Sequence, residues 1–216
     1  MTKLILVRHG QTVWNKLGKY QGQADIELSQ EGLAQARQLA EHFPFANVKA
    51  VYASSLKRAM DTGRKVAEKF GLPVIPCDEL REISFGDWEG LTYEEINNAW
   101  PDVHEGLFAR PDITDCPHGE GFRDVQKRAV AKLKEMVKKH QGETFVIAAH
   151  GGVNRTILCH ALGLSLRYMW NIRQDNTAVN VISFYGDGKA TVDLIKWEPH
   201  IRDFSRELGD QASQRI

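Results

Sequence analysis

The stretch that decides the fold is "LILVRHGQTVWN", residues 4–15. Its first four side chains are aliphatic, and Arg8, His9 and Gly10 follow them directly. A short apolar run that ends this abruptly predicts a buried β-strand over Lys3–Val7. The change from apolar to ionic residues has two interpretations: either the strand simply reaches the surface there, or it delivers a nucleophile into an anion-binding pocket.

Two further apolar runs end in similar chemistry. Val48–Ala53 is followed by two serines and by Arg58, and Thr144–Ala149 is followed by His150-Gly151-Gly152. Apolar residues at helical spacing predict helices over 29–43, 55–70, 122–140 and 151–162, with Ser54 or Ser55 capping the second of them. Strands that alternate with helices predict an α/β fold, a three-layer α/β/α architecture around a mostly parallel sheet.

The remaining segments give weaker signals. Residues 92–99 predict a short helix that Thr92 caps, whereas residues 100–123 contain three prolines and three glycines and are predicted as a loop or loose cap. Alternating residues over 178–185 and 190–197 predict a β-hairpin. The polar residues 203–216 predict a helix or a mobile tail.

The ends of the three apolar strands should meet, because the carboxyl ends of parallel strands share one edge of the sheet, where ligands bind. Two histidines, two arginines and a helix N-terminus would then converge. Guanidinium groups repel a metal cation and match phosphate oxygens two at a time. Helix N-termini add N–H donors for the same anion. The pattern therefore predicts a pocket for a phosphate dianion and no metal site.

Composition narrows the class of protein. The 216 residues carry 28 basic and 28 acidic side chains, so no global positive field favours nucleic acid as a partner. The N-terminal apolar run is too short for a leader or a membrane span, and no membrane partner is expected. Three widely separated cysteines, Cys77, Cys116 and Cys159, form neither a disulfide framework nor a metal motif, which favours a reducing, cytoplasmic compartment.

Four separated blocks resemble the histidine phosphatase superfamily, also called phosphoglycerate mutase-like. They are "LVRHGQTVWN", "YASSLKRAMDTG", "LREISFGDWEGLTYEEI" and "VIAAHGGVNR", in the order of the family. The resemblance spans nearly all of residues 3–197. It implies the phosphoglycerate mutase-like fold in a single domain over residues 1–202, with a cap-like insertion at about 91–123 and a polar tail over 203–216.

The resemblance also implies roles for individual residues. His9 is the expected nucleophile, which becomes a phosphohistidine, and Glu82 is the expected general acid and later the base for water. The expected phosphate-binding groups are the side chains of Arg8, Asn15, Gln21, Arg58 and His150 and the backbone amide of Gly151. The nucleophilic ring nitrogen must be unprotonated, so a backbone carbonyl, such as one in the Gly10 loop, is expected to hold the other N–H.

The resemblance leaves three functions open. The expected one is a phosphomonoesterase that needs neither metal nor cofactor and acts on a small phosphorylated metabolite. The short interval between Glu82 and His150 resembles the compact phosphatases, and "FGDWEGLTYEEI" resembles the branch with alpha-ribazole phosphatase and the broad-specificity phosphatases. The alternatives are phosphoglycerate mutase-type transfer and a catalytically inactive phosphate-binding relative. The sequence does not distinguish a homodimer from a monomer.

The cap-like segment 100–123 is expected to select the rest of the substrate. Its aromatic residues Trp100, Phe108 and Phe122 suit a substrate with a ring, or they tie the segment to the body of the protein. The segment departs from the family pattern at "PHGEGFRD", where Gly121 stands in the place of a common serine.

Overall fold

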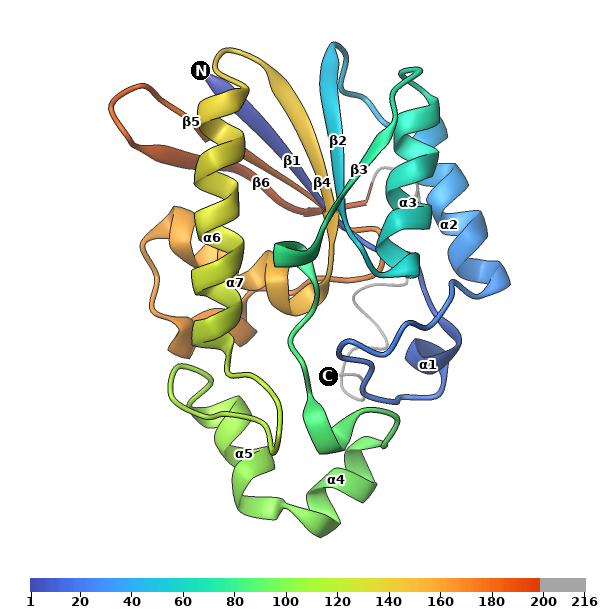
Figure 1. The fold of residues 1–216 in the computed structure, drawn as a ribbon, viewed down its shortest axis with the longest axis vertical. Coiled ribbons are helices and arrows are strands. Elements are labelled where there is room, and N and C mark those ends of the chain that lie inside the picture. The colour runs from blue at the N-terminus through green and yellow to red at the C-terminus, as the bar shows by residue number, and fades with distance from the viewer. Residues whose placement is uncertain (199–216) are drawn as a thin grey trace, which may run out of the picture.

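The computed structural model describes residues 1–198, which form a six-stranded sheet with helices on both faces (Figure 1). The strands lie in the order β3-β2-β4-β1-β5-β6. Their bounds are Val74–Cys77, Val48–Ser54, Thr144–Ala149, Thr2–Arg8, Val179–Phe184 and Ala190–Trp197, in that order. The first four are mutually parallel, and β5 and β6 are antiparallel to their neighbours. The predicted mostly parallel sheet and C-terminal hairpin are confirmed.

Strand β1 shows why the sequence folds into three layers. Its apolar side chains alternate between the two faces of the sheet, with Leu4 and Leu6 in one hydrophobic core and Ile5 and Val7 in the other. All four are fully buried, and burial of such a side chain contributes about 1.5–3 kcal/mol. The strand therefore lies at the centre of the sheet, and whatever follows it is rigidly placed.

Helices cover each face in pairs (Figure 1). α6 (Phe122–Lys139) and α7 (Gly151–Leu162) contribute to the core that contains Leu4, and α2 (Gln30–Glu41) and α3 (Lys57–Glu68) contribute to the other. The predicted three-layer α/β/α architecture is confirmed. No helix within residues 1–198 is both long and apolar enough to cross a membrane.

The predicted serine cap of α3 is wrong. Neither Ser54 nor Ser55 caps the helix: the Ser54 hydroxyl bonds to the His150 ring, and the Ser55 hydroxyl donates to a carboxylate just after β3. The first N–H of the helix donates instead to Asp25 Oδ1, at 2.7 Å. Because this acceptor comes from a distant loop, the local sequence could not reveal it.

The prediction of a loop over residues 100–123 is also wrong in part. α4 (Tyr93–Ala99) has the predicted capping box between Thr92 and Glu95, but a second helix, α5 (Pro101–Ala109), follows at once. Pro101 occupies the first helical position, where its missing N–H costs nothing. Figure 1 shows this helical pair beyond the carboxyl ends of the parallel strands.

The aromatic side chains of the cap pack on the body of the protein. Phe108 packs on Trp170 at 5.2 Å between ring centroids, Phe122 on Trp170 at 5.4 Å, and the Trp170 indole N–H donates to the Leu107 carbonyl. Trp100 packs against the hydrophobic core. These rings tie the cap to the body of the protein, which favours the second of the two interpretations.

The connecting segments contain four short helices. They are α1 (Val13–Lys16), η1 (Asp78–Leu80), η2 (Gly86–Trp88) and η3 (Leu166–Asn171). The first lies inside a segment, residues 8–27, that has no helical pattern in the sequence. The predicted tail over residues 203–216 lies outside the described residues.

Candidate active site

The carboxyl ends of β1, β4 and β2 bring together the residues that the sequence singles out. In the parallel register Arg8, the last residue of β1, is opposite Ala149, the last residue of β4. His9 and His150, which follow these two residues, therefore lie side by side, with ring centroids 5.1 Å apart. Arg58 enters from the first turn of α3, which follows β2. The predicted convergence of two histidines and two arginines is confirmed.

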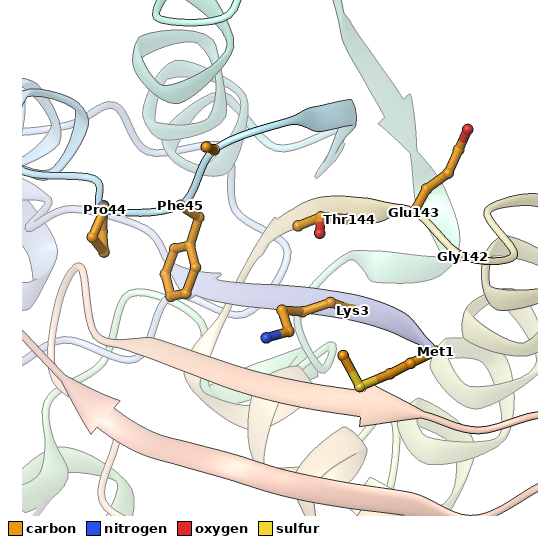
Figure 2. Close-up of a pocket in the computed structure, with 8 residues that line it drawn as sticks. Met1, Lys3, Pro44, Phe45, Gly142, Glu143 and Thr144 are labelled. Atoms are coloured by element: carbon orange, nitrogen blue, oxygen red, sulfur yellow. The ribbon is translucent and has the colours of Figure 1, made fainter.

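A hollow of about 380 Å³ lies at the opposite end of the sheet, beside the amino ends of β1 and β4 (Figure 2). Met1, Lys3 and Phe45 line it, and no histidine or arginine does. Figure 2 shows the Glu143 side chain directed away from the Lys3 amine. Because this hollow lies at the amino ends of the strands and gathers no catalytic groups, the chemistry belongs to the other end.

The backbone fixes the orientation of the His9 ring. His9 Nδ1 lies 2.7 Å from the Gly10 carbonyl oxygen, and the Gly10 N–H in turn donates to the Thr62 hydroxyl. With its proton on Nδ1, the imidazole presents the lone pair of Nε2, for which residues 1–198 supply no hydrogen-bond partner. The expected carbonyl from the Gly10 loop is therefore present, and the ring is arranged as a nucleophile.

Two guanidinium groups, those of Arg58 and Arg8, act on this ring, and that of Arg155 adjoins Arg8. Backbone carbonyls hold all three: Arg8 donates to that of Gln174, Arg58 to those of Gly22 and Ala24, and Arg155 to that of Ile172. In the described part of the chain, no carboxylate forms an ion pair with any of them. The Glu82 carboxylate acts on all three only at longer range, so the buried positive charge favours the binding of an anion.

Unpartnered buried nitrogens point to the same conclusion. Arg8 Nε, Arg58 Nε and His150 Nδ1 are buried and have no hydrogen-bond partner among residues 1–198. Buried polar atoms are normally paired, and three orphans around one site call for a ligand that accepts hydrogen bonds. A tetrahedral anion with several oxygens can satisfy them together.

Burial and the arginines keep both histidines neutral. Burial lowers the pKa of His9 well below its usual value, and the charges of Arg58 and Arg8 lower it further. The pKa of His150 is also lowered well below its usual value, by burial first and then by Arg58, His9 and Arg8. Burial lowers the pKa of Arg58 to about 10, so this guanidinium stays charged near neutral pH. A neutral His9 is the nucleophilic form.

We expect the stability of the ligand-free protein to fall as the pH falls below about 6.5, the usual histidine pKa. The unfolded chain takes up protons on His9 and His150 in this range, whereas the folded state, with its lowered pKa values, does not. Each histidine contributes a slope of at most about 1.4 kcal/mol per pH unit. Urea unfolding at pH 7.0, 6.0 and 5.0 measures this slope.

Substitution can separate the contribution of His9 to this pH dependence of the free energy of unfolding from that of other groups. His9→Ala should show a shallower slope than the parent. A free energy of unfolding that is constant from pH 7.0 to 5.0 would contradict the lowered pKa values.

The Glu82 carboxylate lies at the N-terminus of α7. It accepts the N–H of Gly152 at 3.0 Å and that of Val153 at 3.2 Å, and Oε1 also accepts the N–H of Ile83. A Cβ at position 152 would lie 2.5 Å from Glu82 Oε1, which explains the second glycine of "HGG". The acid is thus held against the first turn of α7, where its charge acts on Arg8 and Arg58.

The other predicted phosphate ligands lie at the rim. Asn15 Oδ1 accepts the Thr12 N–H at 3.0 Å, and Gln21 Oε1 accepts the Thr12 hydroxyl at 2.8 Å. Neither amide nitrogen has an acceptor among the residues that the structure describes, so both can donate to a ligand. The Gly151 N–H, which begins α7, likewise has no acceptor within residues 1–198.

Arg155 is the site residue that sequence reasoning did not identify. A Cβ at Gly151 would lie 3.1 Å from Arg155 Nη1 and 3.5 Å from Arg8 Nε, which places the two guanidinium groups together. Burial lowers the pKa of Arg155 to about 10, and its guanidinium lies 5.1 Å from the centre of the Trp170 ring. Its position in "HGGVNR", one helical turn after Gly151, could have indicated that its side chain lies near the site.

Several known proteins are similar to this chain in sequence and in fold. The family model of the histidine phosphatase superfamily (branch 1) matches residues 4–196. Phosphoserine phosphatase 1 of Hydrogenobacter thermophilus is 35% identical over 182 residues, which are 84% of this chain and 86% of the relative. A metal-independent phosphoserine phosphatase of Arabidopsis thaliana is 37% identical over 160 residues, which are 73% of this chain and 67% of the relative.

A solved structure agrees with both relatives. A phosphoserine phosphatase mutant of Entamoeba histolytica, in complex with phosphoserine, superposes with a TM-score of 0.82 and 30% identity, and the match covers 93% of this chain and all of that one. The match of the family model extends over nearly the whole chain and includes every site residue described above. The chain therefore belongs to the histidine phosphatase superfamily.

Proposed function

We propose that the protein is a phosphomonoesterase that works without a metal ion and through a phosphohistidine at His9. The observation that carries this proposal is the free Nε2 of a neutral His9 beside the guanidinium groups of Arg58 and Arg8, which have no carboxylate within ion-pair distance in the described chain. This arrangement attracts a phosphoryl dianion and presents it to a nucleophile. Phosphoryl transfer needs mainly such positioning and charge stabilisation.

The reaction proceeds in two displacements. His9 Nε2 attacks phosphorus while the bond from phosphorus to the ester oxygen breaks, and Glu82 gives its proton to the departing alkoxide. Water then attacks the phosphohistidine, Glu82 takes a proton from it, the bond between phosphorus and nitrogen breaks, and inorganic phosphate leaves. Arg8, Arg58 and His150 bind the transferring oxygens in both steps, and each such donor contributes about 10²–10³ in rate.

Positive side chains take the place that a metal ion has in other phosphatases. Within residues 1–198, no group of three or more histidines, cysteines, aspartates or glutamates is arranged to hold a metal. The name of the Arabidopsis relative, a metal-independent phosphoserine phosphatase, supports the same mechanism. The amide nitrogens of Asn15 and Gln21 and the Gly151 N–H complete the proposed set of donors.

The third guanidinium favours a substrate with a second negative charge. Arg155 adjoins Arg8 but comes from the side of Trp170, so it can bind a carboxylate next to the phosphate. Phosphoserine carries such a carboxylate, and two relatives are named for it. Alpha-ribazole 5'-phosphate, the other substrate that the sequence suggests, carries none, and Phe108 and Phe122 of the cap, which could have bound its ring, pack on Trp170 instead.

We expect phosphate release in excess EDTA to be faster from phosphoserine than from phosphoethanolamine, which lacks only the carboxylate. A hydrogen bond between charged groups contributes about 1.5–3 kcal/mol, which corresponds to roughly 10- to 100-fold in kcat/KM. Arg155→Met should remove most of this preference and change the rate with phosphoethanolamine little. Replacement of the exposed Arg167 by methionine is the matched control.

Other outcomes would refute specific parts of the proposal. Loss of activity in EDTA contradicts the metal-independent mechanism. Equal rates with the two substrates contradict the carboxylate contact, and faster turnover of alpha-ribazole 5'-phosphate than of phosphoserine assigns the other substrate. Transfer of the phosphoryl group to a second metabolite, without release of phosphate, would make the protein a mutase.

A further inference from the structure

The segment that carries Glu82 has no regular secondary structure. Between η1, which ends at Leu80, and η2, which begins at Gly86, the backbone belongs to no strand or helix. Its carbonyl groups therefore need partners from elsewhere in the protein. How this segment is held decides where the Glu82 carboxyl lies.

One side chain of α6 holds the segment. Arg128 Nη1 donates to the carbonyls of Glu79, at 2.8 Å, and Arg81, at 2.5 Å, and Arg128 Nη2 donates to the carbonyl of Glu82 itself, at 3.0 Å. The Arg128 side chain is 21% exposed. A single guanidinium thus bonds to the backbone at three positions around the acid.

A carboxylate orients this guanidinium. Glu120 Oε1 accepts from Arg128 Nε and Glu120 Oε2 from Arg128 Nη2, both at 3.0 Å, in a two-pronged pair. Glu120 Oε2 also accepts the Ser84 N–H at 2.8 Å, and the Glu120 N–H donates to the Ser84 carbonyl at 2.8 Å. The backbone is therefore held on both sides of Glu82, by Arg128 before it and by Glu120 after it.

Two helices hold Glu82. Arg128 fixes its backbone from α6, and the N–H groups of Gly152 and Val153 meet its carboxylate from α7. The space beside the carboxylate is narrow, because a Cβ at Gly152 would already overlap it. A shift of the backbone at residue 82 cannot be absorbed at the carboxylate without loss of these contacts.

We propose that Arg128, oriented by Glu120, is a positioning residue for the general acid: its hydrogen bonds to three carbonyls place the Glu82 carboxyl at the oxygen of the leaving group. This inference rests on the proposed function, in which Glu82 protonates that oxygen. Lysine could not substitute, because its point charge lacks the planar fork that reaches several carbonyls and a carboxylate together. A displacement of about 1 Å at a catalytic group can cost about 10²-fold in rate.

The dependence on the leaving group separates positioning from a purely structural role. Nitrophenolate departs without a proton, whereas the alkoxide of phosphoserine needs one. The ratio kcat/KM covers the steps up to the phosphoenzyme, so it reports the first displacement alone. We expect Arg128→Lys to lower kcat/KM for phosphoserine by about 10- to 100-fold and for nitrophenyl phosphate by less than about threefold.

Two further variants complete the experiment. Glu120→Gln removes the charge that orients Arg128 and should give the same selective loss, to a smaller extent, so the proposal remains testable if Arg128→Lys does not fold. Arg123→Met is the matched control, since this exposed arginine lies on the same helix and pairs with Asp115 instead. It should leave both substrates unaffected.

The outcomes distinguish the two proposals. An equal loss with both substrates, together with a lower melting temperature, would show that Arg128 only stabilises the fold and would overturn the inference. If Glu82→Gln itself shows no dependence on the leaving group, the role of Glu82 is wrong, and the role of Arg128 fails with it. If the parent protein hydrolyses neither substrate, the proposed function is refuted.

Discussion

Replacement of His9 by alanine should lower kcat by about 10⁴-fold or more, because it removes the nucleophile and leaves only the binding of the phosphate group. Binding should persist, since Arg8, Arg58 and Arg155 are held by backbone carbonyls and not by the imidazole. We therefore expect His9→Ala to bind phosphoserine with about the parent affinity and to hydrolyse almost none of it. Calorimetric titration and phosphate release measure the two quantities separately.

The covalent intermediate gives an independent readout for His9. Labelled substrate mixed with the parent protein and quenched within milliseconds should leave label on the protein that is lost in acid and retained in base, as for a phosphohistidine. The label should be absent from His9→Ala and present in a variant that replaces His160, an exposed histidine of α7, by alanine. Label on His9→Ala, or full activity of that variant, would contradict the assignment.

The fold and the centre of the site could be predicted because they depend on local patterns. Each apolar strand is a short uninterrupted run, and parallel strands place their carboxyl ends at one edge of the sheet, where the structure sets Arg8 opposite Ala149. His9 and His150 must then be neighbours. The need for an unprotonated nucleophile suggested a backbone carbonyl at the other ring nitrogen, and the structure supplies that of Gly10.

The parts that could not be predicted depend on contacts between distant segments. Arg155 and Arg128 lie on helices, where arginine ordinarily faces solvent, and only tertiary packing shows that each bonds to backbone carbonyls of a loop far away in the sequence. The sequence could not predict the capping of α3 by Asp25 for the same reason. In α5 the error was local: the prolines and glycines of residues 100–123 were taken as signs of a loop, although Pro101 starts the helix.

Arg58 and Arg128 illustrate one physical rule. A loop that carries catalytic groups has carbonyls without partners, and a guanidinium can satisfy several of them with one planar group. Arg58 bonds to two carbonyls of the loop at residues 22–24, and Arg128 bonds to three around Glu82. The site therefore uses arginine for two purposes, to attract the anion and to shape the loops that surround it.

Replacement of Glu82 by glutamine should have the second largest effect, and it should depend on the substrate. Glutamine preserves the size of the side chain and can still accept the Gly152 N–H through its oxygen, but it has no proton to give. For phosphoserine, kcat/KM should fall by about 10²–10⁴, the usual contribution of a general acid. For nitrophenyl phosphate, kcat/KM should change little, because its leaving group departs as a stable anion.

The second half of the reaction gives a different signature in the same variant. Glu82 also takes the proton from the attacking water, so hydrolysis of the phosphohistidine should slow by about 10²–10⁴ whatever the first leaving group was. Nitrophenyl phosphate should then give a burst of nitrophenolate equal to the enzyme concentration, followed by slow turnover. Stopped-flow absorbance detects this burst, and glutamine at the exposed Glu94 is the control. A uniform loss on both substrates without a burst would mean that Glu82 binds the phosphate group or supports the fold but does not transfer protons.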